Sequence, residues 1–305
     1  MKKTAGFLVV LFLLLAGTVS ALAIDRSRNL QFRLERGVRV HDGVSSNTIK
    51  LDDGTYRMYY TGEGIRVVDS TNGKDFTNDR QALNQTTVQA AVPTVTQISN
   101  SSIFKLNDGT WRMIFEGKSG TSTSSPRRLY SATSTDGVNN FSVEAGVRLE
   151  DSGTDDTTFT SVPDVVELDD GSLRMYYTAG LKSKSAISSD EGLNWTKEGF
   201  IHLNKRMSTL VDPDVTKVGS KYILLFSTMP AAAGSKPSDE LQKIYRAFST
   251  DGRHFKFAGL KIALSRANAM DPDMVRRGSG KRLRIYFSRM RPTAANSDIL
   301  SALYR

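Results

Sequence analysis

The hydrophobic pattern of this chain is a repeated phrase. In one copy, the turn Asp-Asp-Gly at residues 169–171 precedes Ser-Leu-Arg-Met-Tyr-Tyr-Thr, in which apolar and polar positions partly alternate. Alternation with a period of two is typical of β-strands, and a turn glycine supplies the positive φ of a tight hairpin. The phrase occurs five times, and its final aromatic residue marks each copy: Tyr60, Phe115, Tyr177, Phe226 and Phe287.

The spacing of these markers predicts the fold. They stand about 49 to 62 residues apart, and repeats of roughly 40–50 residues or more, made of short strands, are typical of β-propeller blades. In the third copy we expect four strands, at residues 162–168, 173–178, 185–188 and 196–203. The sequence therefore predicts an all-β, five-bladed β-propeller of four-stranded blades.

A second motif supports this assignment. Residues 188–195 read S-x-D-x-G-x-x-W, an Asp-box (BNR repeat), and similar segments occupy residues 70–76, 134–141 and 249–255. Ser and Asp side chains in such turns hydrogen-bond the local backbone. We expect the Asp-boxes to stabilise hairpins, so they indicate the fold and not the chemistry.

The fifth copy has no outer strand of its own. Residues 32–40 match the outer-strand segments 141–149 and 255–263, whereas the chain ends at residue 305 after the third strand of the last copy. We predict that the N-terminal strand completes the last blade and closes the ring. Closure would protect edges that an open array exposes.

The first 23 residues resemble a signal peptide. Lys2 and Lys3 precede an apolar stretch, residues 6–17, that is too short to span a membrane, and Ala-Leu-Ala at residues 21–23 fits a cleavage site. We expect residues 24–305 to form one domain, exported to a periplasm or the cell exterior, without a membrane span. An uncleaved anchor is the alternative.

The composition limits the classes of partner and cofactor that we expect for this protein. The chain has no cysteine, and its length allows a core that needs no disulfide. Its net charge of +9 is spread without a dense Lys/Arg run, which argues against nucleic acid and leaves an acidic polysaccharide possible. His41, His202 and His254 show no metal-ligand spacing. We expect a monomer without cofactor or metal.

The predicted topology places a site on one face. Strands alternate in direction within a blade, so the starts of inner strands, the ends of second strands and the long loops share that face. These loops are residues 84–100, 119–127, 151–160 and 229–240. Loops gathered over a propeller axis are the expected place for binding and catalysis.

Carboxylates are expected to converge there, because inner strands begin with Pro163-Asp164, Asp212-Pro213-Asp214 and Asp271-Pro272-Asp273. Asp164, Asp214 and Asp273 occupy equivalent places, which favours strand caps that bond neighbouring amides over a functional role. Asp212, Asp271 and Glu116 occur in only some copies and are the stronger catalytic candidates. The candidate substrate-binding residues are Asp42, Asp164, Asp214, Asp273, Arg289 and Arg291. We interpret the recurring Arg57, Arg112, Arg174 and Arg284 as strand-to-strand pairing.

The combined phrases Asp-Pro-x-Val, Asp-Gly-x-x-x-Met-Tyr-Tyr-Thr and Ser-x-Asp-Gly-x-x-Trp resemble the five-bladed propeller glycoside hydrolases, which include family 43 with its arabinanases and β-xylosidases, and the invertase and levansucrase group. The resemblance implies two Asp and one Glu around the axis, as base or nucleophile, orienting or pKa-tuning residue, and general acid. Asp212 and Asp271 match the Asp of the Asp-Pro phrase, and Glu116 is the best-placed acid.

The chain departs from that family in two places. Ser45-Ser46-Asn47 opens the first blade where the family has its base, so that only Asp42 is available nearby, and no Glu directly precedes an inner strand. Three functions therefore remain open: a glycoside hydrolase, a non-catalytic propeller that binds a glycan or envelope component, and a sialidase-like Asp-box protein. Five blades, and repeated arginines inside strands, argue against the sialidase.

Overall fold

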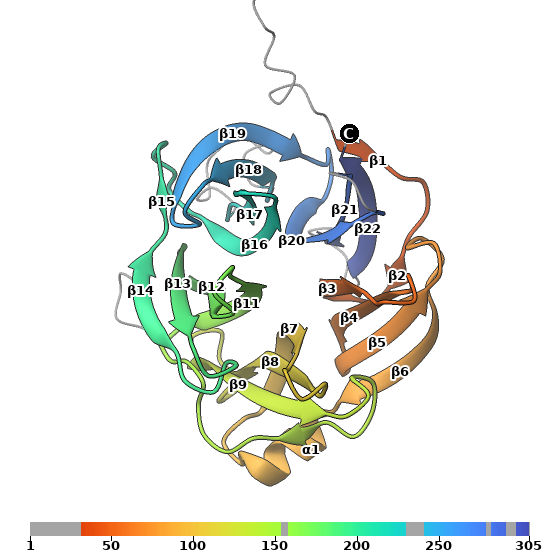
Figure 1. The fold of residues 1–305 in the computed structure, drawn as a ribbon, viewed down its shortest axis with the longest axis vertical. Coiled ribbons are helices and arrows are strands. Elements are labelled where there is room, and N and C mark those ends of the chain that lie inside the picture. Colours follow the sequence, from red (N-terminus) through yellow and green to blue (C-terminus); the bar gives the residue numbers. More distant parts are fainter. Residues whose placement is uncertain (1–31, 154–157, 230–240, 279–281, 291–296, 305) are drawn as a thin grey trace, which may run out of the picture. The chain divides into compact units, whose positions relative to one another are not determined.

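The computed structural model describes residues 32–153, 158–229, 241–278, 282–290 and 297–304, so the predicted signal peptide lies outside the described residues. Residues 31–305 form one compact unit. In this unit five sheets surround a common axis (Figure 1). The predicted all-β, five-bladed propeller is confirmed.

The blades follow one another along the chain, each built outward from an inner strand. Blade 1 contains β3 (Val44–Lys50), β4 (Tyr56–Gly62), β5 (Gly64–Ser70) and β6 (Thr77–Leu83). Blade 2 contains β7 (Gln97–Lys105), β8 (Trp111–Lys118), β9 (Arg127–Ser134) and β10 (Ser142–Val143). Blade 3 contains β11 (Thr160–Glu167), β12 (Leu173–Ala179), β13 (Lys182–Ser188) and β14 (Thr196–Phe200).

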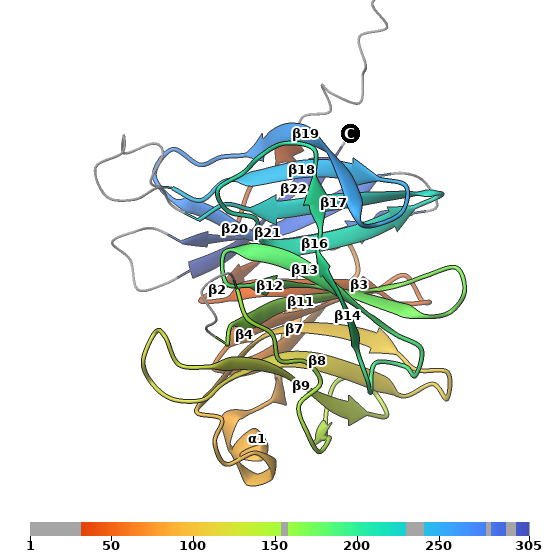
Figure 2. The ribbon, with the colours of Figure 1, turned by 90° about the vertical axis from the view of Figure 1, so that its left-hand side faces the viewer.

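Blade 4 contains β16 (Val211–Val218), β17 (Lys221–Ser227), β18 (Ile244–Ser249) and β19 (His254–Ile262), with β15 (His202–Leu203) alongside β19. Blade 5 contains β20 (Asn268–Arg276), β21 (Leu283–Met290), β22 (Ser297–Tyr304) and β1 (Phe32–Leu34), and β2 (Val40–His41) also pairs with β22. Figure 2 shows the same blades from the side.

The second strand of a blade is buried on both faces because neighbouring blades cover it. All residues of β12 are buried. Met175 and Tyr177 pack with residues of blade 2, whereas Tyr176 packs with residues of blade 4. Successive side chains of a strand point to opposite faces, so one apolar strand contributes to two inter-blade cores.

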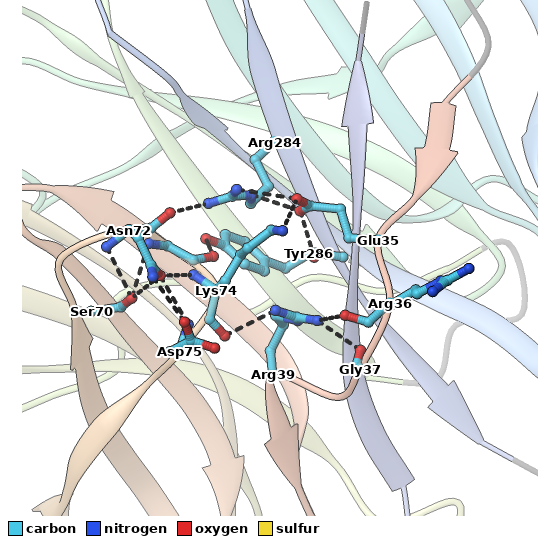
Figure 3. Close-up of polar contacts among 12 residues, drawn as sticks. Glu35, Arg36, Gly37, Arg39, Ser70, Asn72, Lys74, Asp75, Arg284 and Tyr286 are labelled. Atoms are coloured by element: carbon cyan, nitrogen blue, oxygen red, sulfur yellow. Dashed lines mark hydrogen bonds and ion pairs between the residues drawn. The ribbon is translucent and has the colours of Figure 1, made fainter.

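The N-terminal strand closes the ring as predicted. Phe32 lies opposite Tyr304, and Leu34 opposite Ala302, in antiparallel pairing. Beyond the strand, Arg284 donates to the Glu35 carboxylate at 2.8 Å and also to the backbone oxygen of Asn72 in blade 1, at 2.7 Å (Figure 3). The closure therefore joins blade 5 both to its N-terminal strand and to blade 1.

The recurring arginines make the same kind of contact elsewhere. Arg174 donates to Glu198 within its own blade at 2.9 Å, and to the backbone oxygen of Asp251 in the next blade at 2.9 Å. Blade 4 has Ile223 at the equivalent position.

The turns predicted to be Asp-boxes bond their own backbone. Ser188 accepts from the amide of Gly192 at 2.9 Å, and Asp190 accepts from the amide of Asn194 at 2.9 Å. Trp195 packs against the core between blades 2 and 3. These contacts satisfy local backbone groups and point away from a catalytic role.

Two elements differ from the sequence-based expectation. Residues 84–100 were expected as a loop but include the helix α1 (Gln85–Ala91), capped by Asn84 and anchored by the buried Val88. The segment after β14 does not continue blade 3: β15 pairs in parallel with β19 and so connects blade 3 to blade 4. No helix in the described part of the chain is long and apolar enough to cross a membrane.

Candidate functional site at the propeller axis

A closed ring of hydrogen bonds holds the inner strands together. Five equivalent side chains each accept from a backbone amide of the next blade. The pairs are Asn47 with Ile103 (3.0 Å), Ser102 with Val165 (3.1 Å), Asp164 with Val215 (2.7 Å), Asp214 with Met274 (3.2 Å) and Asp273 with Thr48 (3.1 Å). We call this set the amide ring. Asp164, Asp214 and Asp273 thus fulfil the strand-cap interpretation.

Burial shifts the acidity of the carboxylates in the amide ring. It raises the pKa of Asp164 to about 7, with a further contribution from the charge of Asp273. It raises the pKa of Asp273 to about 6. Burial, followed by the charges of Asp164 and Asp273, raises the pKa of Asp214. The cause is general, because a low-dielectric site and like charges both disfavour the ionised form.

Two residues earlier in each inner strand, the backbone adopts a left-handed conformation. Each site coincides with a β-bulge in the pairing of the first two strands. The five residues have φ between 45° and 51°: Ser45, Asn100, Val162, Asp212 and Asp271. Because all five blades share the conformation, it belongs to the fold. What differs between blades is the side chain that it presents, and only blades 4 and 5 present carboxylates.

The charge of Asp271 influences the acidity of Asp212. Burial raises the pKa of Asp212 to about 8, and the charge of Asp271 contributes next. Burial also raises the pKa of Asp271, and the charge of Glu116 adds to it. Asp212 is half-buried, whereas Asp271 is only 7% exposed and its Oδ2 has no hydrogen-bond partner among the described residues. The two carboxyl groups therefore share raised pKa values but differ in exposure, with Asp212 the more accessible of the two.

Glu116 occupies a position that is a hydroxyl residue in the other four blades. The residue after the marker aromatic is Thr61, Glu116, Thr178, Ser227 or Ser288. Three of these hydroxyls accept from the amide of the next blade's left-handed residue: Thr61 from Asn100 at 2.8 Å, Thr178 from Asp212 at 2.9 Å and Ser288 from Ser45 at 2.9 Å. When the five copies are aligned on the marker aromatic, Glu116 is distinguished from the hydroxyl residues of the other four copies, and this is the sequence signal for it.

The Glu116 carboxylate already has several partners. Arg127 donates to Oε1 at 2.6 Å, the side chain of Asn100 donates to Oε2 at 2.7 Å, and the Ser161 hydroxyl also bonds Oε2. Only 1% of Glu116 is exposed. Sequence reasoning did not identify Arg127, Asn100 or Ser161 as partners of Glu116, because Arg127 and Asn100 lie on neighbouring strands and Ser161 lies in the next blade.

A small cavity lies on the axis beside these carboxylates. Its volume is about 20 Å³, and its lining includes Ser45, Asn100, Asp214 and Asp271. A space of this size holds about one water molecule. Among the described residues, no group of three or more His, Cys, Asp or Glu side chains is arranged to hold a metal ion.

Two other predicted substrate-binding residues, Asp42 and Arg289, do not line this cavity. Asp42 is exposed and left-handed, in the turn between β2 and β3, and does not line it. Arg289 is paired with Asp298, whose other oxygen lies 2.9 Å from Nδ1 of His41. Arg291 lies outside the described residues.

No protein-family model matches the chain, and no curated protein matches it by sequence. Solved structures do match over most of its length. A thermostable family-43 glycoside hydrolase superposes with a TM-score of 0.69 at 14% identity, covering 90% of this chain and 93% of that chain.

Arabinanases match in the same way. The Cellvibrio cellulosa α-L-arabinanase complexed with arabinohexaose has a TM-score of 0.62 at 13% identity, with 88% of this chain and 91% of that chain covered. The native Bacillus subtilis arabinanase has a TM-score of 0.63 at 16% identity, with 89% and 96% covered. The predicted resemblance to five-bladed propeller glycoside hydrolases is thus confirmed at the level of the fold.

Proposed function

We propose that this protein is an exported glycoside hydrolase whose proton transfers are carried by Asp212 and Asp271. The observation that supports this most is the pair itself: carboxylates stand at equivalent positions of adjacent blades, where blade 1 has Ser45. Similarity of fold to family-43 enzymes and to an arabinanase solved with arabinohexaose supports a saccharide substrate. The leader-like residues 1–23 support export.

The two carboxylates take different roles because their environments differ. Asp212, with a pKa of about 8, is protonated at neutral pH and half-buried, so it suits the general acid that donates to the glycosidic oxygen. Asp271 is the acceptor: it takes a proton from the attacking water, or attacks the anomeric carbon itself. In both cases the bond to the departing sugar breaks and that sugar takes the proton from Asp212. If Asp271 has attacked, Asp212 then takes a proton from the water that cleaves the bond between Asp271 and the sugar, so that overall water adds across the glycosidic bond.

Glu116 takes a supporting role in this proposal and not that of the acid. Its two oxygens are bonded to Arg127, Asn100 and Ser161, and it is almost fully buried. Its charge contributes to the raised pKa of both Asp212 and Asp271. Glu116 therefore positions the neighbouring groups and tunes the acidity of the pair.

A non-catalytic glycan-binding propeller is the second candidate. Blade 1, which carries the base in the resembling family, presents Ser45, whose backbone amide donates to the Ser288 hydroxyl at 2.9 Å. A protein of this kind would bind a saccharide over the same carboxylates without hydrolysing it.

The test is a hydrolysis screen of the purified protein on aryl arabinosides, xylosides and galactosides and on plant polysaccharides. Asp212→Asn and Asp271→Asn should each lower kcat/KM by about 10²-fold or more, without lowering the melting temperature. Glu116→Gln should reduce turnover less. Asp52→Asn, an exposed turn substitution of the same type, is the control.

Two results would reject the enzyme. If Asp212→Asn, Asp271→Asn and Glu116→Gln all leave the turnover unchanged, that turnover does not depend on these carboxylates and comes from another source. Absence of turnover, combined with measurable binding of an oligosaccharide, would favour the glycan-binding propeller instead.

A further inference from the structure

A second cavity lies beside blade 3, where the chain crosses to blade 4. Its volume is about 330 Å³, within the usual range for small-ligand sites. Phe200, Leu203, Met207 and Leu210 form its apolar wall. We call it the crossover pocket.

Three cations line the crossover pocket: Lys182, Lys205 and Arg206. None of them forms an ion pair with a carboxylate among the described residues, and no acidic residue is among those that line the pocket. Nearby lysines behave differently, since Lys184 lies 3.1 Å and Lys197 3.5 Å from Asp151. The pocket therefore contains three positively charged side chains that no carboxylate of the described residues neutralises.

Two of the cations, Lys182 and Arg206, lie close enough to interact, whereas Nζ of Lys205 lies 4.3 Å from the ring centroid of Phe257. Lys182 donates to the backbone oxygen of Met207 at 2.5 Å, which fixes its ammonium group at the pocket. Burial, and then the positive charge of Arg206, lowers the pKa of Lys182. Like charges placed together are unfavourable unless an anion joins them, so the arrangement favours an anionic ligand.

The apolar wall limits what that ligand can be. Phe200 is 39% exposed, and the Nζ of Lys184 lies 4.8 Å from its ring centroid. Lys184, which Asp151 pairs, lies over one face of this ring. The part of the ring that stays exposed, beside the cations of the pocket, suits a ligand with an apolar ring face and an acidic group. A sugar ring that carries a carboxylate or sulfate has both features, whereas a free inorganic anion has only the charge.

The crossover pocket is close to the axial carboxylates along the chain. Leu210 is two residues before Asp212, which places their Cα atoms roughly 7 Å apart in extended backbone. The amide of Leu210 donates to the oxygen of Leu181 at 3.0 Å, which holds this segment against blade 3. The wall of the crossover pocket is therefore two residues from Asp212 along the chain.

We propose that the crossover pocket binds the acidic group of a saccharide, a uronic-acid carboxylate or a sulfate ester, and that the substrate is therefore an acidic glycan. This inference rests on the proposed function for the identity of the ligand as a glycan.

The test measures binding to Asp212→Asn protein by calorimetry, so that hydrolysis does not interfere. The probes are tetragalacturonate, a chondroitin sulfate tetrasaccharide and the neutral galactotetraose. The variant Lys205→Gln/Arg206→Gln removes two exposed cations, and Arg33→Gln/Lys221→Gln is a control of the same composition, made at exposed residues that do not line the pocket.

We expect at least one acidic probe to bind more tightly than galactotetraose, and the Lys205→Gln/Arg206→Gln variant to weaken that binding by roughly tenfold or more. The control should change it by less than about twofold. The better acidic probe identifies carboxylate or sulfate as the recognised group. Equal binding of acidic and neutral probes, no binding of either acidic probe, or equal losses in both double variants would overturn the proposal.

Failure of the hydrolase proposal is distinguishable from failure of this one. If the protein is inactive but still binds tetragalacturonate through Lys205 and Arg206, the proposal for the crossover pocket stands and the hydrolase proposal is rejected. If the protein hydrolyses a neutral glycan and neither acidic probe binds through the crossover pocket, the hydrolase proposal stands and the proposal for the pocket is rejected.

Discussion

Arg284 and Glu35 form an ion pair of 2.8 Å although 249 residues separate them in the sequence. Both side chains are buried, with 2% and 6% exposure. Ser301 donates to the same carboxylate at 2.8 Å, and Arg284 also reaches the turn of blade 1. The last strands of the chain, its N-terminal strand and the first blade therefore meet at one carboxylate.

Glu35→Ala should destabilise the protein strongly, because it leaves a buried guanidinium without its anion. We expect the free energy of unfolding to fall by about 3 kcal/mol or more, measured by urea denaturation. Glu150→Ala is the matched control, since Glu150 pairs with Arg128 at 2.7 Å but is 47% exposed, and it should cost about 1 kcal/mol or less. Equal losses would show that closure does not depend on Glu35.

Deleting residues 30–40 should lower the melting temperature far more than trimming an ordinary terminus. The deletion removes β1, Val40 of β2 and the Glu35 carboxylate, and it exposes the edge of β22. Differential scanning calorimetry would compare the protein without residues 30–40 with a longer protein that lacks only residues up to 29. A melting temperature within a degree or two of the longer protein would contradict the closure of the ring by this strand.

Asp164→Asn should stabilise the protein at pH 8 and not at pH 4. The folded-state pKa of Asp164 is raised to about 7, above its ordinary value, so its contribution to stability is present below about pH 4 and is lost as pH rises through 7. The amide can still accept from Val215, as Asn47 does from Ile103. We expect a gain of about 1–3 kcal/mol at pH 8. A gain of the same size at pH 4 would contradict this account of Asp164, with Asp52→Asn as the control.

Replacing Asp271 should make Asp212 more acidic. The charge of Asp271 contributes to raising the pKa of Asp212 to about 8, and Asn removes that charge. Carbon-13 NMR of the side-chain carboxyl should therefore show the Asp212 titration moving to lower pH in Asp271→Asn protein. An unchanged titration would mean that the two carboxylates do not interact.

Repetition made the fold predictable from the sequence. The five aromatic markers fixed the number of blades, and the match of residues 32–40 to other outer strands predicted the closure. The helix α1 has no comparable signal, since Thr86, Thr87 and Val88 are weak helix formers. Burial of Val88 and the Asn84 cap account for it, and burial of this kind depends on the tertiary structure.

The candidate site was predictable only in part. Residues that break the repeat, Asp212, Asp271 and Glu116, could be identified because the fold does not require them. The left-handed backbone could not, since Val162 adopts it although β-branched residues disfavour positive φ. The partners of Glu116 come from other strands and a neighbouring blade, so no local pattern links them. The catalytic roles stay predictions.

The most direct test of the central claim is the dependence of turnover on the leaving group in Asp212→Asn protein. A general acid matters for a poor leaving group and hardly matters for an activated one. If Asp212 is the acid, the Asp212→Asn variant should show a kcat/KM lower by about 10²-fold or more for an alkyl or unsubstituted aryl glycoside. Its kcat/KM for a dinitrophenyl glycoside of the same sugar should stay close to that of the protein with Asp212. Equal losses on both substrates, or no loss on either, would contradict the assignment of Asp212 as the proton donor.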